Sequence, residues 1–116
     1  MLTIGPIGVA AAEAIRQAEA EQPELAIAHY DMRFLKPLDE RLLTEVAARY
    51  RKVITVEDGV RTGGLGTAVL EWLSDHGVKA QVIRLGLPDV FVEHGPVGAL
   101  HHIYGIDVEG IKKHLL

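Results

Sequence analysis

The residues best suited to chemistry lie close together between Glu57 and Thr67. An apolar, β-branched run at 53–56 ends at the carboxylate of Glu57, and Arg61 follows in a loop. From Leu65 onward, apolar residues recur at the helical spacing i, i+3, i+4, i+7 and i+8. A strand, a glycine-rich loop and a helix N-terminus can together present backbone N–H groups to an anion. Parallel α/β sheets also pass from strand to helix in this way, so both interpretations stay open.

Each of these residues also has a structural interpretation. Glu57 could face a site or a partner subunit, could cap the next helix, or could pair with Arg33 or Lys36. We favour structural pairing, because ion-pair networks perturb carboxylates as often as catalysis does. Arg61 could hold a phosphate together with the helix N-terminus, but we favour an arginine in a solvated loop.

The glycines of the loop are Gly63, Gly64 and Gly66. They do not match the dinucleotide pattern G-x-G-x-x-G, and no Walker lysine follows them, so the indication of nucleotide binding is weak. We expect them to allow close packing of the helix on the sheet.

The histidines do not have the spacing of a metal site. The chain has six, and the adjacent pair His101 and His102 points to different faces of a predicted helix. Zinc ligands need a tight pair with a third partner, so no metal-binding residue is predicted. His94 precedes Gly95 and Pro96, and we expect it to fix that turn through a backbone hydrogen bond. No Ser/His/Asp arrangement or carboxylate pair is singled out, so no catalytic residue is predicted.

Composition indicates one globular domain over residues 1–116. Hydrophobic residues make up 48% and charged residues 24%. The net charge of −4 and the lack of a Lys/Arg cluster argue against nucleic acids and anionic membranes as partners. There is no cysteine, and neither a membrane span nor a signal peptide is indicated, so we expect a cytoplasmic protein.

Hydrophobic periodicity predicts alternating strands and helices. Strands are expected at 2–5, 25–30, 53–57 and 80–85, and helices at 9–21, 40–50, 64–76, 96–104 and 108–114. Asp39 and Asp107 are predicted N-caps, and Gly77 is predicted to end the third helix. The alternation predicts an α/β fold with helices on both faces of a mostly parallel, four-stranded sheet. The first residues already have the pattern of a buried strand, so we expect a piece of a longer polypeptide.

In open α/β sheets, ligands bind beyond the carboxyl ends of the strands. The loops expected there are 5–8, 31–37 and 57–66. We therefore take the candidate anion-binding or interface residues to be Asp31, Arg33, Glu57, Arg61, Gly63, Gly64, Gly66 and His94.

Three motifs carry a resemblance to a known family. Residues 31–39 (DMRFLKPLD) resemble the D-x-R-x-x-K-P-x-D signature of 1-deoxy-D-xylulose-5-phosphate synthase. Residues 56–59 (VEDG) with 63–66 (GGLG) resemble its glycine-rich turn, although Asp58 stands where many relatives have glutamate. Residues 85–95 (LGLPDVFVEHG) are similar to its G-L-P-D-x-F motif. The motifs occur in the family's order, and the resemblance is to its third, C-terminal domain.

The resemblance implies a supporting role for this domain. The whole enzyme would condense pyruvate with glyceraldehyde 3-phosphate, losing carbon dioxide, for isoprenoid (terpenoid), thiamine and pyridoxal synthesis. Thiamine diphosphate, magnesium and the main catalytic residues would belong to the two preceding domains, so no cofactor is expected in this fragment. The implied partners are those preceding domains and the second subunit of a homodimer. The family's C-terminal domain also begins with an antiparallel edge strand that this chain is expected to lack, which would leave an exposed sheet edge beside 25–30.

Two classes of function therefore stay open. The favoured one is a structural and dimer-forming domain of a thiamine-dependent transferase, whose loops help to wall the cleft or contact the partner subunit. The alternative is an autonomous small-anion or effector-binding module that uses the helix N-terminus at Gly63–Thr67. Exposed apolar side chains would favour the first. A weaker third possibility is a docking module for another protein.

Overall fold

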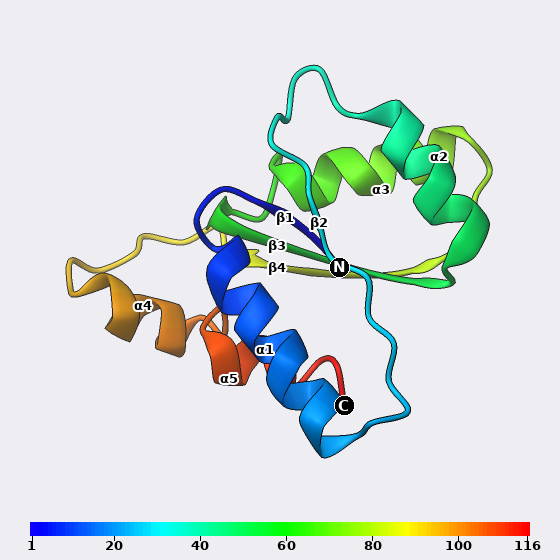
Figure 1. Ribbon diagram of the computed structural model, residues 1–116. Coiled ribbons are helices and arrows are strands. Elements are labelled where there is room, and N and C mark those ends of the chain that lie inside the picture. The colour runs from blue at the N-terminus through cyan, green and yellow to red at the C-terminus, as the bar shows by residue number, and fades with distance from the viewer.

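The computed structural model describes all residues, 1–116, as a chain of alternating strands and helices (Figure 1). The strands are β1 (Leu2–Ile4), β2 (Tyr30–Asp31), β3 (Lys52–Val60) and β4 (Gln81–Leu87). The helices are α1 (Gly8–Glu21), α2 (Glu40–Arg49), α3 (Leu65–Asp75), α4 (Val97–Ile103) and α5 (Val108–Lys112). None of these helices combines the length and the apolar character that crossing a bilayer requires.

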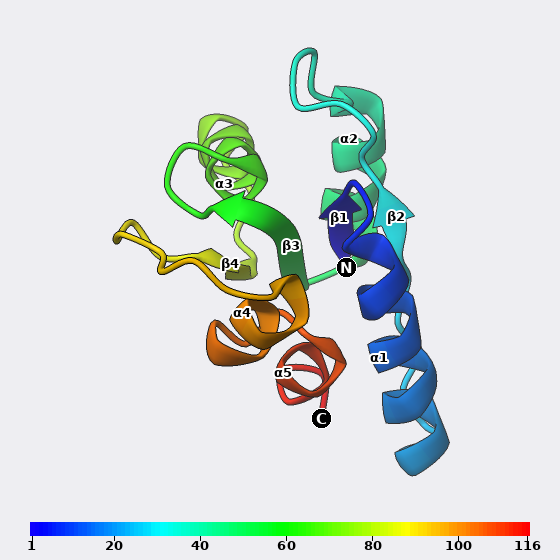
Figure 2. The same ribbon diagram turned by 90° about the vertical axis from the view of Figure 1, so that its left-hand side faces the viewer.

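The strands form one sheet in the order β2-β1-β3-β4, and every neighbouring pair is parallel. Leu2 of β1 lies opposite Tyr30 of β2 on one side and Thr55 of β3 on the other. Helices α2 and α3 cover one face, and α1, α4 and α5 lie on the other (Figure 2). The expected three-layer α/β/α fold is therefore confirmed.

Two hydrophobic clusters fill the spaces between the layers. The cluster on the side of α1 and α5 is built from Ile7, Ala11, Ala14, Ile15, Ala18, Ile54, Val56, Ile106, Ile111 and Leu115. The cluster on the side of α2 and α3 is built from Leu2, Met32, Leu43, Val46, Val53, Leu65, Val69, Trp72 and Leu73. Strand β3 contributes to both clusters through alternate residues, as expected for a central strand that is buried on both faces.

Local capping signals set the helix boundaries. The Asp39 carboxylate accepts a hydrogen bond from Leu42 N at 3.0 Å, and that of Asp107 accepts one from Gly110 N at 2.8 Å. These bonds satisfy backbone donors that the first helical turn leaves free. Gly77 has a φ of 66° just after α3, a left-handed conformation that favours glycine. All three predicted helix-boundary residues are confirmed.

The strand predicted at 25–30 is wrong in most of its length. Only Tyr30 and Asp31 form β2, and residues 25–29 have no regular secondary structure. A strand is defined by hydrogen bonds to a neighbouring strand. Before Tyr30, the only bond of this kind runs from the amino nitrogen of Met1 to Ala28 O. β-propensity alone could not reveal this lack of a partner.

The chain between β4 and α5 packs loosely. Residues 88–96 have no regular structure, and α4 has no buried residue. Large apolar side chains are exposed in and around this segment, among them Phe91 at 91% and Ile103 at 68%.

Candidate functional site

The predicted site lies where β3 ends and α3 begins, at the edge of the sheet where the strands reach their carboxyl ends (Figure 1). Strand β3 continues three residues past its predicted end at Glu57, because Val60 still pairs with Leu87 of β4 after an irregularity in register. The chain then turns through residues 61–64 into α3.

Glu57 caps α3 from the neighbouring strand. Its Oε1 accepts a hydrogen bond from Leu65 N and its Oε2 accepts one from Gly66 N, both at 2.9 Å. The side chain is buried, with only 6% exposed. An anion at a helix N-terminus is stabilised by the free N–H groups and by the positive end of the helix dipole. Here the protein's own carboxylate is that anion, and it forms no ion pair with Arg33 or Lys36.

Two glycines of the turn, Gly64 and Gly66, leave no room for a side chain. A Cβ added to Gly64 would lie 1.8 Å from Glu57 Oε1 and 2.9 Å from Val60 O. A Cβ on Gly66 would lie 2.8 Å from both Thr55 Oγ1 and Arg84 Cγ. Gly63 adopts a φ of 77°, which side-chain-bearing residues rarely adopt. Close packing therefore explains Gly64 and Gly66, as expected, whereas Gly63 is explained by its backbone conformation and not by packing.

Thr67 holds this turn together, a role that the sequence interpretation did not assign to it. Its Oγ1 accepts from Gly63 N at 3.0 Å and from Arg84 Nη1 at 3.2 Å, and donates to Arg61 O at 3.1 Å. Thr67 is the third residue of α3, and a polar side chain there commonly bonds back to the residues before the helix. A threonine at the third position of a predicted helix was therefore the sequence signal that could have identified this role of Thr67.

The remaining candidates do not converge on this turn. Asp31 Oδ1 accepts from the backbone N of Arg33, which has a φ of 60°, so these two residues form a local turn after β2. The Arg61 side chain is exposed and has no hydrogen bond or ion pair. His94 forms no hydrogen bond, so the expected backbone bond is absent. Its loop packs too little to hold a side chain in place.

The histidines of α4 lie against carboxylates instead. His101 Nε2 lies 3.1 Å from Asp58 Oδ2, which joins α4 to β3, and His102 Nδ1 lies 2.7 Å from Asp107 Oδ2. The His101–Asp58 pair was not predicted, and no local signal could reveal a contact between residues so far apart in sequence. The bond from Gly110 N, followed by the His102 pair, lowers the pKa of the Asp107 carboxyl.

The arrangement of Glu57, the turn and Thr67 stabilises a strand-to-helix junction. Nowhere does the structure gather three or more His, Asp or Glu side chains in an arrangement that could hold a metal ion. The N–H groups of the α3 N-terminus that an external anion would need, those of Leu65 and Gly66, are already bonded to Glu57.

Comparison with known proteins defines the class. The family described as "Transketolase, C-terminal domain" matches residues 1–111. The chain belongs to this family. It is also similar to proteins named 1-deoxy-D-xylulose-5-phosphate synthase. That of Phocaeicola vulgatus is 54% identical over all 116 residues, and that of Aquifex aeolicus is 43% identical over 92% of the chain.

These relatives are much longer than the chain, which spans 18% of the Phocaeicola vulgatus protein and 17% of the Aquifex aeolicus protein. A solved structure described as "Split gene transketolase, inactive beta4 tetramer" matches 98% of the chain and 36% of its own length. The TM-score is 0.87 and the identity is 36%. The expected resemblance to the C-terminal domain of this enzyme family is therefore confirmed.

Proposed function

We propose that the chain is the C-terminal domain of a 1-deoxy-D-xylulose-5-phosphate synthase and serves structure and dimerisation rather than chemistry. The observation that carries the proposal is the 54% identity over the whole chain to a protein of that name. The enzyme would be a transketolase-type transferase of the cytoplasm that joins pyruvate to glyceraldehyde 3-phosphate for isoprenoid precursors.

The residues present do not fit the cofactors of such an enzyme. Thiamine diphosphate bound through magnesium needs oxygen ligands gathered around the metal, and the structure brings no such group together. We therefore place thiamine diphosphate and magnesium in other domains of the full enzyme and derive no step of the reaction from this chain.

The exposed apolar side chains support a domain that is covered by others. Phe34 is 66% exposed in the loop after β2, and Phe91 and Val97 are exposed beside α4. Exposed apolar side chains gathered in one segment, as Val90, Phe91 and Val97 are, are typical of a contact surface. We propose that these loops contact the preceding domains or the second subunit of a homodimer.

The test is formation of deoxyxylulose phosphate by the chain alone, by a full-length polypeptide that contains it, and by that polypeptide with this domain removed. We expect activity only in the full-length protein. Activity of the chain alone would overturn the proposal, because it would place a complete active site within these residues. Full activity after removal of the domain would overturn the supporting role.

The alternative of an autonomous anion-binding module receives no support from the geometry. Glu57 holds the position that a phosphate would take at the N-terminus of α3. The nearby Arg61 side chain is exposed and forms no ion pair, and the hollow that it lines with Arg84 and Lys113 does not include the N-terminus of α3.

A further inference from the structure

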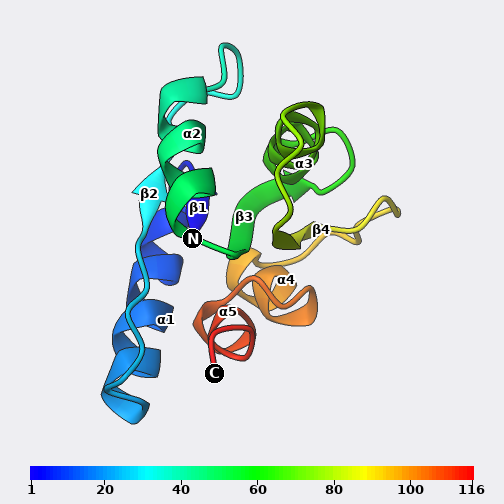
Figure 3. The ribbon, with the colours of Figure 1, turned by 90° about the vertical axis from the view of Figure 1, so that its right-hand side faces the viewer.

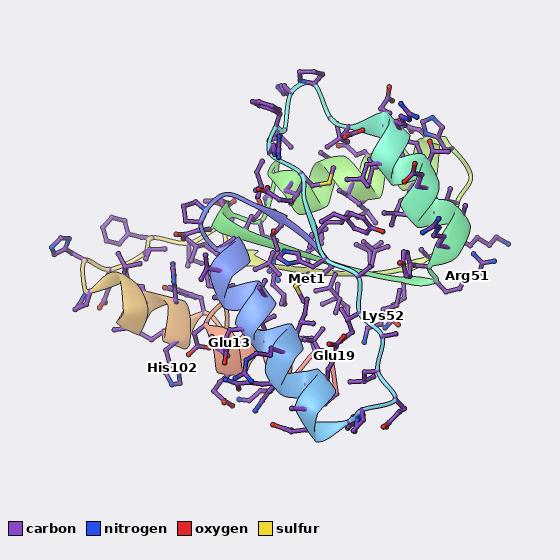
Figure 4. All side chains as sticks on the ribbon, viewed as in Figure 1. Met1, Glu13, Glu19, Arg51, Lys52 and His102 are labelled. Carbon is purple, nitrogen blue, oxygen red and sulfur yellow. The ribbon has the colours of Figure 1, made fainter.

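An apolar groove lies at the opposite edge of the sheet, where the strands begin. Its volume is about 460 Å³, and most of its lining is hydrophobic. One wall is the segment 25–28 and the other is the start of β3, and Met1 closes the groove at the end nearest β1. Figure 3 shows the N-terminus at this place, between the two helical layers. Figure 4 labels Met1 and Lys52, two of the residues that line the groove.

The first wall has the hydrogen-bonding pattern of a strand without a neighbour. The amino nitrogen of Met1 donates to Ala28 O at 2.6 Å, and Met1 O accepts from Tyr30 N at 3.0 Å. These are the two bonds that one residue makes in a parallel ladder. The next pair along would use the C=O of Ala26 and the N–H of Ala28, and neither has a backbone partner.

The second wall also has backbone groups without a strand partner. Pairing between β1 and β3 starts at Leu2 and Thr55, so residues 52–54 of β3 pair with β4 alone. Gln81 N binds Arg51 O, which means that odd-numbered residues here direct their backbone groups to β4. By alternation, the C=O of Lys52 and the N–H of Ile54 face the groove.

The ammonium group of Met1, just before β1, is a charge in a largely apolar groove. No carboxylate pairs with the Met1 ammonium, and desolvation lowers its pKa to about 6. A peptide N–H in the same position would make the bond to Ala28 O without a charge to desolvate.

We propose that the groove accommodates an extended, apolar peptide segment joined to the amino group of Met1, which continues β1 between residues 25–28 and β3. At about 3.3 Å per residue, some four residues would run the length of the wall. Val46 and Tyr50 line the groove beside α2, and Leu25 and Leu115 line it on the other face of the sheet. The segment should therefore be apolar on both faces, as central parallel strands are.

A strand fits these observations better than a small apolar ligand. The free groups form two facing rows, with a donor and an acceptor on each wall. A small hydrophobic molecule would bury them without partners, which is costly. This inference concerns the completion of the fold and does not depend on the proposed enzymatic function.

The test compares three versions of the chain that carry four residues directly before Met1, behind the same short polar leader. The first has Val-Ala-Val-Ile, the second has Val-Ala-Pro-Ile and the third has Gly-Ser-Gly-Ser. The proline replaces the residue whose N–H should bind Ala26 O. It therefore removes one hydrogen bond of the ladder, and proline is disfavoured in central strands. Thermal unfolding and amide hydrogen exchange are measured for each.

We expect the Val-Ala-Val-Ile version to unfold at least about 5 °C above the Gly-Ser version. The amides of Ala28 and Ile54 should exchange at least about tenfold more slowly in it, and the proline version should lose most of both effects. Equal unfolding temperatures with unchanged exchange at these two amides would overturn the proposal. Protection of the same amides in the unextended chain that rises with protein concentration would also overturn it, because a second copy would then occupy the groove.

Discussion

The two edges of the sheet, at the carboxyl and the amino ends of the strands, differ in how many backbone groups find hydrogen-bond partners within the chain. At the carboxyl edge, Glu57 binds the first N–H groups of α3, and Thr67 ties the preceding turn to the helix. At the amino edge, the C=O of Ala26 and the N–H of Ala28 lack backbone partners beside an apolar groove. The edge at which α/β proteins usually bind ligands is closed by this chain's own side chains, and the opposite edge is open.

This difference indicates what each edge requires. At the closed carboxyl edge, the bonds of Glu57 and Thr67 fix the turn between β3 and α3 and occupy the N–H groups of Leu65 and Gly66. An open amino edge needs another segment to complete the sheet. Substitutions at the two edges should therefore differ in sign as well as in size.

The largest effect is expected from Gly64→Val at the closed edge. Its Cβ would fall 1.8 Å from Glu57 Oε1 and 2.9 Å from Val60 O, so the turn and the Glu57 cap must both shift. We expect a loss of roughly 3 kcal/mol or more in the free energy of unfolding. Urea unfolding followed by circular dichroism measures it.

Gly98→Ala in α4 is the matched control, because a Cβ there meets nothing within 4 Å. It should leave stability equal or raise it by up to about 1 kcal/mol. A Gly64→Val protein that unfolds at the same urea concentration as the unchanged chain would refute the packing interpretation of the turn.

Glu57→Gln tests the cap itself and should cost about 2 kcal/mol. The amide keeps one acceptor oxygen but turns an NH2 group toward a backbone N–H and removes the negative charge at the helix N-terminus. Glu71→Gln on the exposed side of α3 provides the comparison and should change stability by less than about 0.5 kcal/mol. If both variants unfold alike, Glu57 is not the residue that closes this edge.

Much of the fold could be predicted because its signals are local. Asp39, Asp107 and Gly77 set helix boundaries through atoms within four residues of themselves, and the apolar stripes of the helices follow from periodicity. The strand at 25–30 could not be judged in the same way, because its existence depends on what lies opposite it. The continuation of β3 to Val60 likewise depends on Leu87 of β4.

The candidate site was predicted in position but not in its bonds. Glu57 does meet the turn, at Gly64 and Gly66, because strand, turn and helix follow one another in sequence. Capping of the next helix was one of the roles considered for Glu57, and the choice among those roles required coordinates. Arg84 reaches Thr67 from β4, and His101 reaches Asp58 from α4. Such contacts between distant elements are visible only in the tertiary structure.

At the open edge, stability should rise with pH between about 6 and 8. The Met1 ammonium has its pKa lowered to about 6, so over this range the unfolded chain binds more protons than the folded one. The cost of burying the charge is present below pH 6 and is relieved above pH 8. We expect about 1 kcal/mol, below the roughly 3 kcal/mol that a two-unit shift would allow, because the group keeps some contact with water.

Nα-acetylation is the matched control for this titration. It removes the charge while an N–H stays available for Ala28 O, so the acetylated chain should lose most of the rise. His29 titrates nearby, and its pKa is lowered first by desolvation and second by the charge of the Met1 ammonium, so acetylation should leave only the desolvation part of its contribution. Equal pH profiles for the two forms would place the effect at the desolvated His29 side chain and not at the Met1 amino group.

Arg61→Ala should have the smallest effect, a change within about 0.5 kcal/mol, because the side chain is exposed and only its backbone is bonded. Thermal unfolding of the chain measures this. A large drop would show that Arg61 takes part in closing the carboxyl edge. The same substitution in a full-length protein separates stability from contact: an unchanged unfolding temperature of the chain with weaker subunit association would assign Arg61 to a surface between domains or subunits. The closed edge would then act as a rigid support for that contact.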